Sequence, residues 1–332
     1  MDATAPVLVT GANGFVGSHV VDELLRRDLP VRVAVRRSSR IDALPVDRVE
    51  VCRVDYEERG AVEPLVDSAR AVIHVAGATR AATDDDYERA NVRTTRDLAE
   101  ACARPAGAPR HFVLVSSLAA AGPSTRERVR DEMQSERPIS AYGRSKLRAE
   151  RVLREAASDR LAWSILRPPA VFGPRDRDFL RLARMVERGW VPRIGSVPQA
   201  LSVVHVRDLA RVLVDVVGDH RAEGRTWFVA DPAPTDWDEI VDVMADTLRR
   251  RPRRIPVSTG LLPVAAGMSS MIGQLLRRPG PLPADRLADL QAEAWTCSPA
   301  RIARELGFRP AVTLREGLHE TVRWYREHGW LP

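Results

Sequence analysis

Tyr142 and Lys146 stand four residues apart, and Lys146 is the only lysine among the 51 Lys and Arg side chains. On a helix, positions i and i+4 share a face, so we expect the phenol and the ammonium to point the same way. A nearby cation lowers the pKa of a phenol below its ordinary value of about 10. Such a tyrosine can give a proton to a carbonyl oxygen or take one from a hydroxyl. We interpret the pair as an acid–base centre; the alternative is a solvated helix pair with a half-buried tyrosine.

A second candidate site is a glycine-rich segment near the amino terminus. It follows a short apolar run at residues 7–9 and precedes an amphipathic stretch at 18–27, which together predict a strand, a turn and a helix. Gly11 permits the tight turn, Gly14 lets the backbone approach a pyrophosphate, and Gly17 allows close packing of helix on strand. The helix N-terminus offers free N–H groups to the phosphates. An ordinary glycine-rich loop is the alternative.

The residue after the second expected strand, at 31–35, indicates which dinucleotide is bound. An acidic residue there hydrogen-bonds the 2′-hydroxyl of NAD, whereas an arginine offers a cation to the 2′-phosphate of NADP. The chain has Arg36 at this place, with Arg37 and Arg40 behind it and no Asp or Glu. The sequence therefore favours NADP(H) over NAD(H).

Polar residues also follow the third and fifth expected strands. Ligands of open α/β sheets bind outside the carboxyl ends of strands. Asp55, after the strand at 49–54, could accept from an adenine amino group, although a cap or turn explains it equally well. Ser116 and Ser117 follow the strand at 111–115, and a serine there can hold a substrate carbonyl against the tyrosine.

The fourth expected strand, at 71–75, contains His74 and is followed by small residues at 76–78. A histidine in mid-strand is more often packed than catalytic, so we assign His74 to the core. The small residues would let a cofactor lie against the backbone. The next expected helix, at 87–102, carries Asn91, a candidate polar contact near the site.

Length and composition set limits on the function. The chain has 332 residues, 44% of them hydrophobic, enough for one large or two modest domains. Its net charge is +6, but basic and acidic residues alternate and no basic block has interleaved aromatics, so no nucleic-acid partner is expected. Three scattered cysteines predict neither a metal site nor a disulfide framework. With no charged leader and no run of 18 apolar residues, we expect a cytoplasmic protein.

With these residues in view, the chain resembles the extended short-chain dehydrogenase/reductase family, the NAD-dependent epimerase/dehydratase superfamily. Its Gly-x-x-Gly-x-x-Gly spacing is typical of short-chain dehydrogenases/reductases. The branch it most resembles contains 3β-hydroxysteroid dehydrogenases and dihydroflavonol reductases. The resemblance covers almost the whole chain and is carried by Thr10–Gly17, Asp55, His74–Gly77, Asn91–Thr95, Val115–Ser117, Tyr142–Lys146, Arg167–Pro174, Val204–Asp208, Glu305–Pro310 and Glu316–Tyr325.

The resemblance implies site roles residue by residue. The family's triad falls on Ser117, Tyr142 and Lys146, with Tyr142 as the acid–base and Lys146 lowering its pKa and binding the nicotinamide ribose. The second serine of a Ser-Ser-x-x-x-x-Gly pattern is usually the catalytic one, which selects Ser117 and leaves Ser116 near the nicotinamide. The residues expected to bind the cofactor are Thr10, Gly11, Asn13, Gly14, Phe15, Val16, Gly17, Arg36, Arg37, Asp55, Tyr56, Ala76, Gly77, Ala78, Asn91, Val115, Ser116, Tyr142, Lys146, Pro168 and Val171.

Five strand–helix units in about 145 residues predict an α/β fold with a doubly wound, Rossmann-type parallel sheet. We expect a dinucleotide-binding domain at 1–167, to which later strands at about 200–230 contribute. The resemblance implies a smaller, mostly helical substrate-binding lobe at 168–332, interleaved with the first domain. In this half, helices are expected at 179–188, 208–217 and 236–249, and strands at 201–205 and 227–230.

Two features bear on the substrate. The most apolar stretch, 261–276, is followed by Arg277 and Arg278; it could pack on the core, which we favour, cover an apolar substrate, or lie on a membrane surface. Ala170 stands where sugar-nucleotide epimerases and dehydratases usually carry Asn, which removes one polar contact to a diphosphate. Arginines such as Arg193 could replace that contact.

These observations predict an NADP(H)-dependent oxidoreductase, such as a ketoreductase, that acts on a ketone or secondary alcohol of a fairly apolar small molecule. The alternative is a nucleotide-sugar epimerase or dehydratase with tightly bound NAD, against which Arg36 and Ala170 argue. Non-catalytic, NADP-sensing relatives typically lose the tyrosine or the lysine, and both are present here. By the same resemblance we expect a homodimer through the helices at 91–102 and 142–155.

Overall fold

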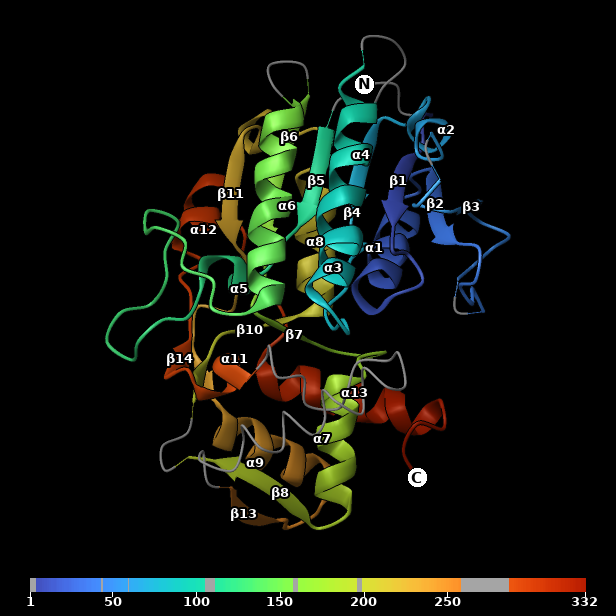
Figure 1. Cartoon of the computed structure of the whole chain (residues 1–332). Helices are drawn as coiled ribbons and strands as arrows, with labels where there is room; N and C mark the ends of the chain where they lie inside the picture. Colours follow the sequence, from blue (N-terminus) through green and yellow to red (C-terminus); the bar gives the residue numbers. More distant parts are fainter. Residues whose placement is uncertain are drawn as a thin grey trace.

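Seven parallel strands form the central sheet of the protein, for which we use a computed structural model (Figure 1). Their order is β11-β6-β5-β4-β1-β2-β3, and each neighbouring pair is parallel. The predicted α/β fold with a doubly wound parallel sheet is confirmed. The strands are β1 (Val7–Thr10), β2 (Val31–Arg36), β3 (Glu50–Val54), β4 (Ala71–His74), β5 (His111–Val115), β6 (Ala162–Arg167) and β11 (Arg225–Phe228).

The structure describes residues 4–42, 44–58, 60–104, 111–157, 161–195, 199–257 and 287–332. The apolar stretch at 261–276 and the two arginines after it lie outside the described residues. None of the described helices combines the length and the hydrophobicity of a membrane span.

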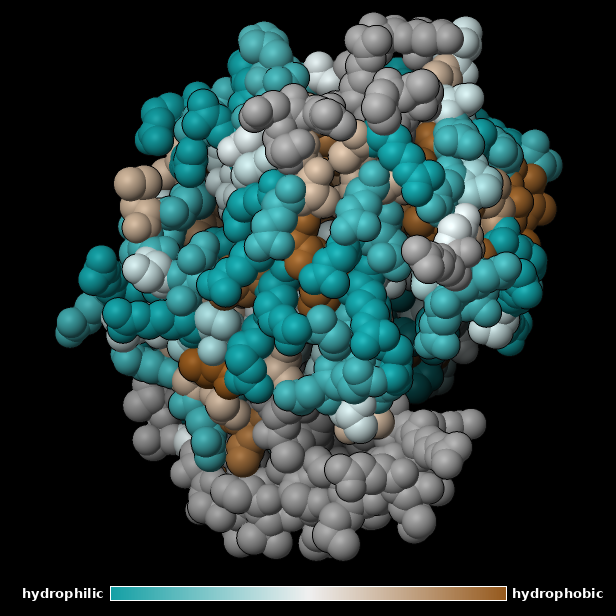
Figure 2. Space-filling view, turned by 45° about the horizontal axis from the view of Figure 1, so that its top comes forward, coloured by the Kyte–Doolittle hydropathy of each residue, from teal (hydrophilic) through white to brown (hydrophobic). Residues whose placement is uncertain are grey.

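Helices cover both faces of the sheet. On one face α1 (Phe15–Arg26), α8 (Val206–Asp215) and α12 (Ala300–Leu306) bury apolar side chains against the strands. On the other, α2 (Glu63–Val66), α4 (Thr94–Cys102) and α6 (Ala141–Ala157) do the same. The outward side of the α4–α6 layer is mainly hydrophilic (Figure 2), so both helices are amphipathic, with their apolar stripes turned to the sheet.

A smaller lobe lies beyond the carboxyl ends of the strands (Figure 1). Three helices, α7 (Asp178–Glu187), α9 (Trp237–Leu248) and α13 (Leu314–Glu327), share one apolar core there. The remaining elements of the described residues are α3 (Asp84–Tyr87), η1 (Glu88–Arg93), α5 (Leu118–Ala121), β7 (Ala170–Phe172), β8 (Trp190–Ile194), β9 (Ala200–Leu201), β10 (Val203–His205), η2 (His220–Ala222), β12 (Thr235–Asp236), β13 (Arg253–Val257), α11 (Leu287–Gln291) and β14 (Ala294–Trp295).

The direction in which the sheet is built reverses between β1 and β4. From β1 the chain builds outward through β2 and β3, and from β4 it builds in the opposite direction through β5 and β6. At such a reversal the loops after the two central strands turn apart and leave a crevice. The glycine turn follows β1 and the small residues 76–78 follow β4, so both predicted cofactor loops border this crevice.

Two expected elements differ in the structure. The helix expected at 87–102 is divided, because η1 is a π-helical segment between α3 and α4. The two threonines that follow η1 form hydrogen bonds with its carbonyl groups. Thr94 donates to the Arg89 carbonyl, and Thr95 donates to the Asn91 carbonyl. The strand expected at 201–205 is interrupted at Ser202, whose N–H donates to the Trp295 carbonyl.

Candidate active site

One cavity of about 2510 Å³ runs from the carboxyl ends of the central strands to the lobe. Pockets for drug-sized ligands usually measure about 300–1,000 Å³, so this cavity has room for a dinucleotide and a second molecule. All residues expected to bind cofactor or carry out catalysis line it, except Thr10 and Asn91. Thr10 and Asn91 are almost fully buried and lie behind the residues that line the cavity.

The glycine turn leaves a helix N-terminus open to the cavity. Gly11 has φ +67°, a value that favours glycine, and its carbonyl accepts from the Gly14 N–H at 3.0 Å. A Cβ at Gly17 would overlap the Gly11 carbonyl, so the packing of α1 on this turn requires glycine. No described side chain caps α1, and its first turn has no acidic residue. Its N–H groups therefore remain available to a phosphate.

The arginines after β2 differ in their partners. Arg37 forms an ion pair with Glu58 at 3.1 Å, and Arg40 forms one with Asp42 at 2.6 Å. The Arg36 side chain lines the cavity, is exposed, and forms no hydrogen bond or ion pair with the described residues. An unpaired guanidinium at this place is suited to a phosphate.

The residues after β3 are placed at the same end of the cavity. Asp55 accepts from the Glu57 N–H at 3.1 Å, so the turn suggested as an alternative role is present. Its other oxygen is not used in this turn. The buried hydroxyl of Tyr56 has no hydrogen-bond partner among the described residues, and burial raises its pKa. Both residues line the cavity.

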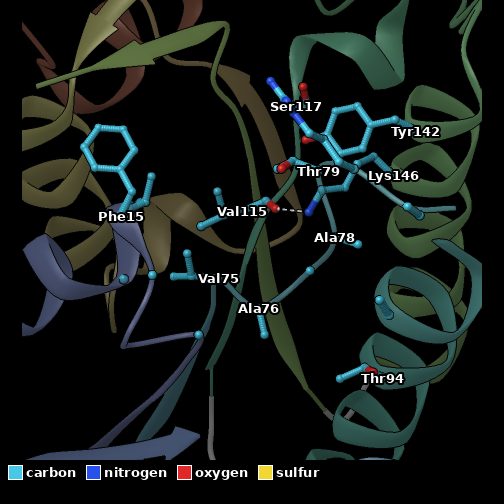
Figure 3. A pocket seen from close by; sticks show the side chains of 18 of the residues that line it. Phe15, Val75, Ala76, Ala78, Thr79, Thr94, Val115, Ser117, Tyr142 and Lys146 are labelled. Carbon is cyan, nitrogen blue, oxygen red and sulfur yellow. Dashed lines mark hydrogen bonds between the residues drawn. The ribbon is translucent and has the colours of Figure 1, made fainter. Parts of the chain in front are cut away.

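Ser117, Tyr142 and Lys146 gather on one wall, across from Phe15 and Val75 (Figure 3). Tyr142 and Lys146 come from consecutive turns of α6, as their spacing predicted. The Lys146 ammonium donates to the Val115 carbonyl at 2.9 Å. Burial lowers the pKa of Lys146 to about 8, against the opposing effect of the Glu150 carboxylate.

The two serines after β5 have different surroundings. Ser116 donates to Glu150 at 2.5 Å, inside a buried ion pair that Glu150 makes with Arg167 at 2.6 Å. The Ser117 oxygen caps α5 by accepting from the Ala119 N–H at 3.1 Å, which leaves its hydrogen free to donate. This favours Ser117 as the residue that meets a substrate oxygen. Glu150 was not anticipated, although it lies one turn after Lys146 and that spacing could have indicated it.

Asn91 fixes the loop after β4 instead of lining the cavity. Its amide accepts from the Ala78 N–H at 2.8 Å and donates to the Ala78 carbonyl at 3.1 Å. The same amide donates to the hydroxyl of Ser145 on α6 at 2.8 Å. Asn91 therefore ties residues 76–78 to the helix that bears Tyr142.

The lobe contributes a wall that sequence analysis missed. Trp295 packs near Tyr142 with Ala81 and Ala119, and its indole donates to the Asp289 carbonyl at 2.8 Å. The other unanticipated lobe residues that line the cavity include Phe179, Leu201, Leu290, Trp324 and Trp330. They come from segments far apart in the chain, and no local spacing connects them.

An ion pair joins the two parts of the molecule beside the cavity. Arg80, after β4, lies 2.9 Å from Asp178 at the start of α7. Both side chains line the cavity. Among the described residues, no cluster of three or more His, Cys, Asp or Glu side chains is arranged to hold a metal ion.

The chain is similar to known proteins over nearly its whole length. A family model described as "NAD dependent epimerase/dehydratase family" matches residues 7–230. The ceramide reductase of Caulobacter vibrioides is 33% identical over 341 residues, which cover 100% of this chain and 98% of that protein. The 3 beta-hydroxysteroid dehydrogenase/Delta 5→4-isomerase of Mycobacterium tuberculosis is 28% identical, with coverage of 96% and 90%. The solved structure of MoeE5 in complex with UDP-glucuronic acid and NAD is 27% identical, with a TM-score of 0.78 and coverage of 97% and 99%.

Proposed function

The chain belongs to the NAD-dependent epimerase/dehydratase family, and we propose that it is an NADP(H)-dependent oxidoreductase acting on a ketone or secondary alcohol. The resemblance to this family and to 3β-hydroxysteroid dehydrogenases, drawn from the motifs, is confirmed. One observation carries the proposal: Ser117, Tyr142 and Lys146 meet on one wall of the cavity that the glycine turn borders.

The residues around the glycine turn fit a nicotinamide dinucleotide. The open N-terminus of α1 suits a pyrophosphate, and the overlap that a Cβ at Gly17 would cause shows how closely helix and turn approach. Arg36 has a charge without a described partner and suits the 2′-phosphate of NADP. The bound nicotinamide would supply hydride to a ketone or accept it from an alcohol.

Ser117, Tyr142 and Lys146 bind the substrate oxygen and transfer the proton. For reduction, Ser117 donates a hydrogen bond to the carbonyl oxygen, and Tyr142 gives that oxygen its proton. The Lys146 ammonium stabilises the phenolate that remains. For oxidation the phenolate takes the proton of the alcohol, so the same residues serve both directions.

An apolar substrate is supported by the wall beyond Tyr142. Ala81, Ala119 and Trp295 pack around this tyrosine, and Leu201 and Leu290 continue the wall toward the lobe. Arg175, Arg177 and Arg181 also line the cavity, and two of them pair with acids, Arg175 with Asp22 and Arg181 with Asp178. Two relatives carry a ceramide and a hydroxysteroid in their names, which agrees with an apolar substrate.

A nucleotide-sugar epimerase that keeps NAD bound is the second candidate function. The solved structure with UDP-glucuronic acid and NAD and the size of the cavity favour it. Against it stands Ala170, which lines the cavity where an asparagine would contact a diphosphate. Arg36 in place of an acidic residue also argues for NADP(H).

Cofactor titration tests the proposal. Nucleotide-free protein is titrated with NADPH and with NADH by fluorescence, and nucleotide retained after purification is assayed. We expect tighter binding of NADPH. Because a hydrogen bond to a charged group contributes about 1.5–3 kcal/mol, Arg36→Glu should weaken NADPH binding about 10- to 100-fold and leave NADH binding nearly unchanged.

Arg40→Glu is the matched control, since Arg40 already pairs with Asp42 and does not line the cavity; it should alter neither affinity. Tightly retained NAD without a preference for NADPH would contradict the 2′-phosphate assignment and favour the epimerase. Tighter binding of NADPH than of NADH would justify a screen of apolar ketones, in which NADPH oxidation is measured.

A further inference from the structure

The segment that leads from α9 into β13 holds five arginines in the six residues 249–254. No aromatic residue lies within this run, so the sequence alone did not mark it as a binding surface. In the structure, β13 pairs in parallel with β8, and Arg253 is directly opposite Trp190. The fold therefore brings an aromatic side chain from another segment to the arginine run.

One face of the β8–β13 pair is packed inside the lobe. Val191 is 1% exposed and belongs to the apolar core of α7 and α9. Its opposite neighbour Arg254 donates to Asp242 of α9 at 2.5 Å. Successive side chains of a strand point to opposite faces, so the residues on either side of these two point away from the lobe.

The outward face is mainly apolar. It carries Trp190 and Pro192 from β8, and Arg253, Ile255 and Val257 from β13. Trp190 is 41% exposed and Ile255 is 48% exposed. Both are among the large hydrophobic residues that are exposed in the described part of the chain. Figure 1 shows the pair at the end of the lobe farthest from the central sheet.

The arginines around this face are only partly neutralised. Arg250 pairs with Glu187 at 3.2 Å, and Arg254 pairs with acids of α9. The others are exposed and form no side-chain ion pair with the described residues: Arg188, Arg249, Arg251 and Arg253. Unneutralised positive charge therefore lies on and next to the β8–β13 face.

We propose that this β8–β13 face docks on an anionic phospholipid surface. Tryptophan is favoured at the membrane–water interface, aliphatic side chains enter the headgroup boundary, and arginines are attracted to anionic lipids. Single-stranded nucleic acid is a poorer fit, because its bases stack on aromatic rings and this face offers one ring among aliphatic side chains. The docking does not depend on the proposed catalytic activity, since binding is measurable without turnover.

Vesicle co-sedimentation of the full chain tests the proposal. The probes are phosphatidylcholine vesicles and vesicles that also contain phosphatidylglycerol. We expect binding only to the anionic vesicles, weakened by added salt. Because each arginine near an anionic surface contributes about fivefold to affinity, Arg251→Gln/Arg253→Gln should weaken binding about 25-fold. Trp190→Ser should also weaken it.

The matched control is Arg128→Gln/Arg309→Gln, which removes the same charge at two exposed positions elsewhere; it should bind vesicles like the wild type. Thermal melts confirm that each variant is folded. The proposal is overturned if the wild type does not bind anionic vesicles, or if the control loses as much affinity as the Arg251/Arg253 variant. It is also overturned if Trp190→Ser leaves vesicle binding intact but changes the oligomeric state, which would assign the face to a second copy of the chain.

Discussion

Oγ1 of Thr10 lies 2.6 Å from Nδ1 of His74, directly behind the glycine turn. The Ala76 N–H donates to the same threonine oxygen, so the Thr10 hydroxyl donates to His74. On the other side, Thr95 donates to the Asn91 carbonyl at 2.6 Å and therefore accepts from Nε2 of His74 at 3.1 Å. Burial lowers the pKa of His74 to about 3, and a neutral imidazole satisfies this chain of hydrogen bonds.

We expect His74→Leu to destabilise the protein and to weaken cofactor binding. It would leave the hydroxyls of Thr10 and Thr95 buried without one partner each, at about 1–3 kcal/mol per group, and it would loosen the loop at 76–78. Denaturant unfolding gives the stability, and NADPH titration gives the affinity. The neighbouring variant Ile73→Val should cost only about 0.5–1.5 kcal/mol. Equal losses in the two variants would show that the hydrogen-bond chain contributes nothing.

Tyr142→Phe should remove catalysis and leave the fold intact. The substitution deletes the proton donor and keeps the ring, so we expect kcat to fall about 10²- to 10⁴-fold with little change in NADPH affinity. Tyr87→Phe is the control, because the Tyr87 ring lies 6.1 Å from the Tyr142 ring and its hydroxyl donates to the Thr79 carbonyl at 3.4 Å. A similar fall in kcat for both variants would contradict the assignment of Tyr142.

Much of this site could be predicted because its signals are local. The glycines and the Tyr142–Lys146 pair lie within single loops or helices, and residues at strand ends reach one edge of the sheet wherever the strands are parallel. Ser116 and Ser117 could not be distinguished from residue type alone. Their difference depends on Glu150, which reaches Ser116 across the fold.

The lobe was harder to predict because its contacts are long-range. Trp295 reaches the wall near Tyr142 from beyond residue 290, and Trp190 meets Arg253 through a strand pairing that neither segment encodes by itself. The expected helix at 87–102 had the right location, but the sequence pattern did not indicate its π-helical segment.

Two glycines of the turn should respond differently to alanine. A Cβ at Gly17 would overlap the backbone of Gly11, which cannot easily move aside. We therefore expect Gly17→Ala to lower the free energy of unfolding by about 3 kcal/mol. A Cβ at Gly14 would lie 3.2 Å from the Gly11 carbonyl oxygen, and the backbone of Gly14 is extended. Gly14→Ala should therefore fold normally but bind cofactor poorly, because its methyl group meets the pyrophosphate.

Thermal melts and NADPH titration separate the two effects. Gly189→Ala serves as a reference for backbone strain alone, since Gly189 has φ +82° and open space around its Cβ position; it should cost about 1–3 kcal/mol. A Gly14→Ala variant that binds NADPH like the wild type would place the pyrophosphate elsewhere.

Acid should unfold the protein near pH 5, because four histidines are buried in neutral form. Burial lowers the pKa of His19 and His111 to about 4 and that of His74 and His205 to about 3. In the unfolded chain each titrates near 6.5. Between these values the unfolded state binds more protons than the folded state, so stability decreases as the pH falls below about 6.5.

One buried carboxyl opposes this effect. Burial raises the pKa of Asp176 to about 6, so here the folded state binds the extra proton and gains stability as the pH falls from about 6 toward 3.8. At pH 5 each histidine lowers the free energy of unfolding by about 2 kcal/mol, and Asp176 raises it by about 1.4 kcal/mol. The net loss from pH 7 is about 6 kcal/mol, which is a large part of the 5–15 kcal/mol that typically stabilises a protein.

Circular dichroism during acid titration, with urea unfolding at each pH, measures this loss. The slope of stability against pH near pH 5 should correspond to about three protons taken up on unfolding. His220→Gln should leave the profile unchanged, because the His220 side chain is 90% exposed. If stability stayed constant down to pH 4, these histidines would be solvated in the folded state. A solvated His74 would be incompatible with the hydrogen-bond chain behind the glycine turn.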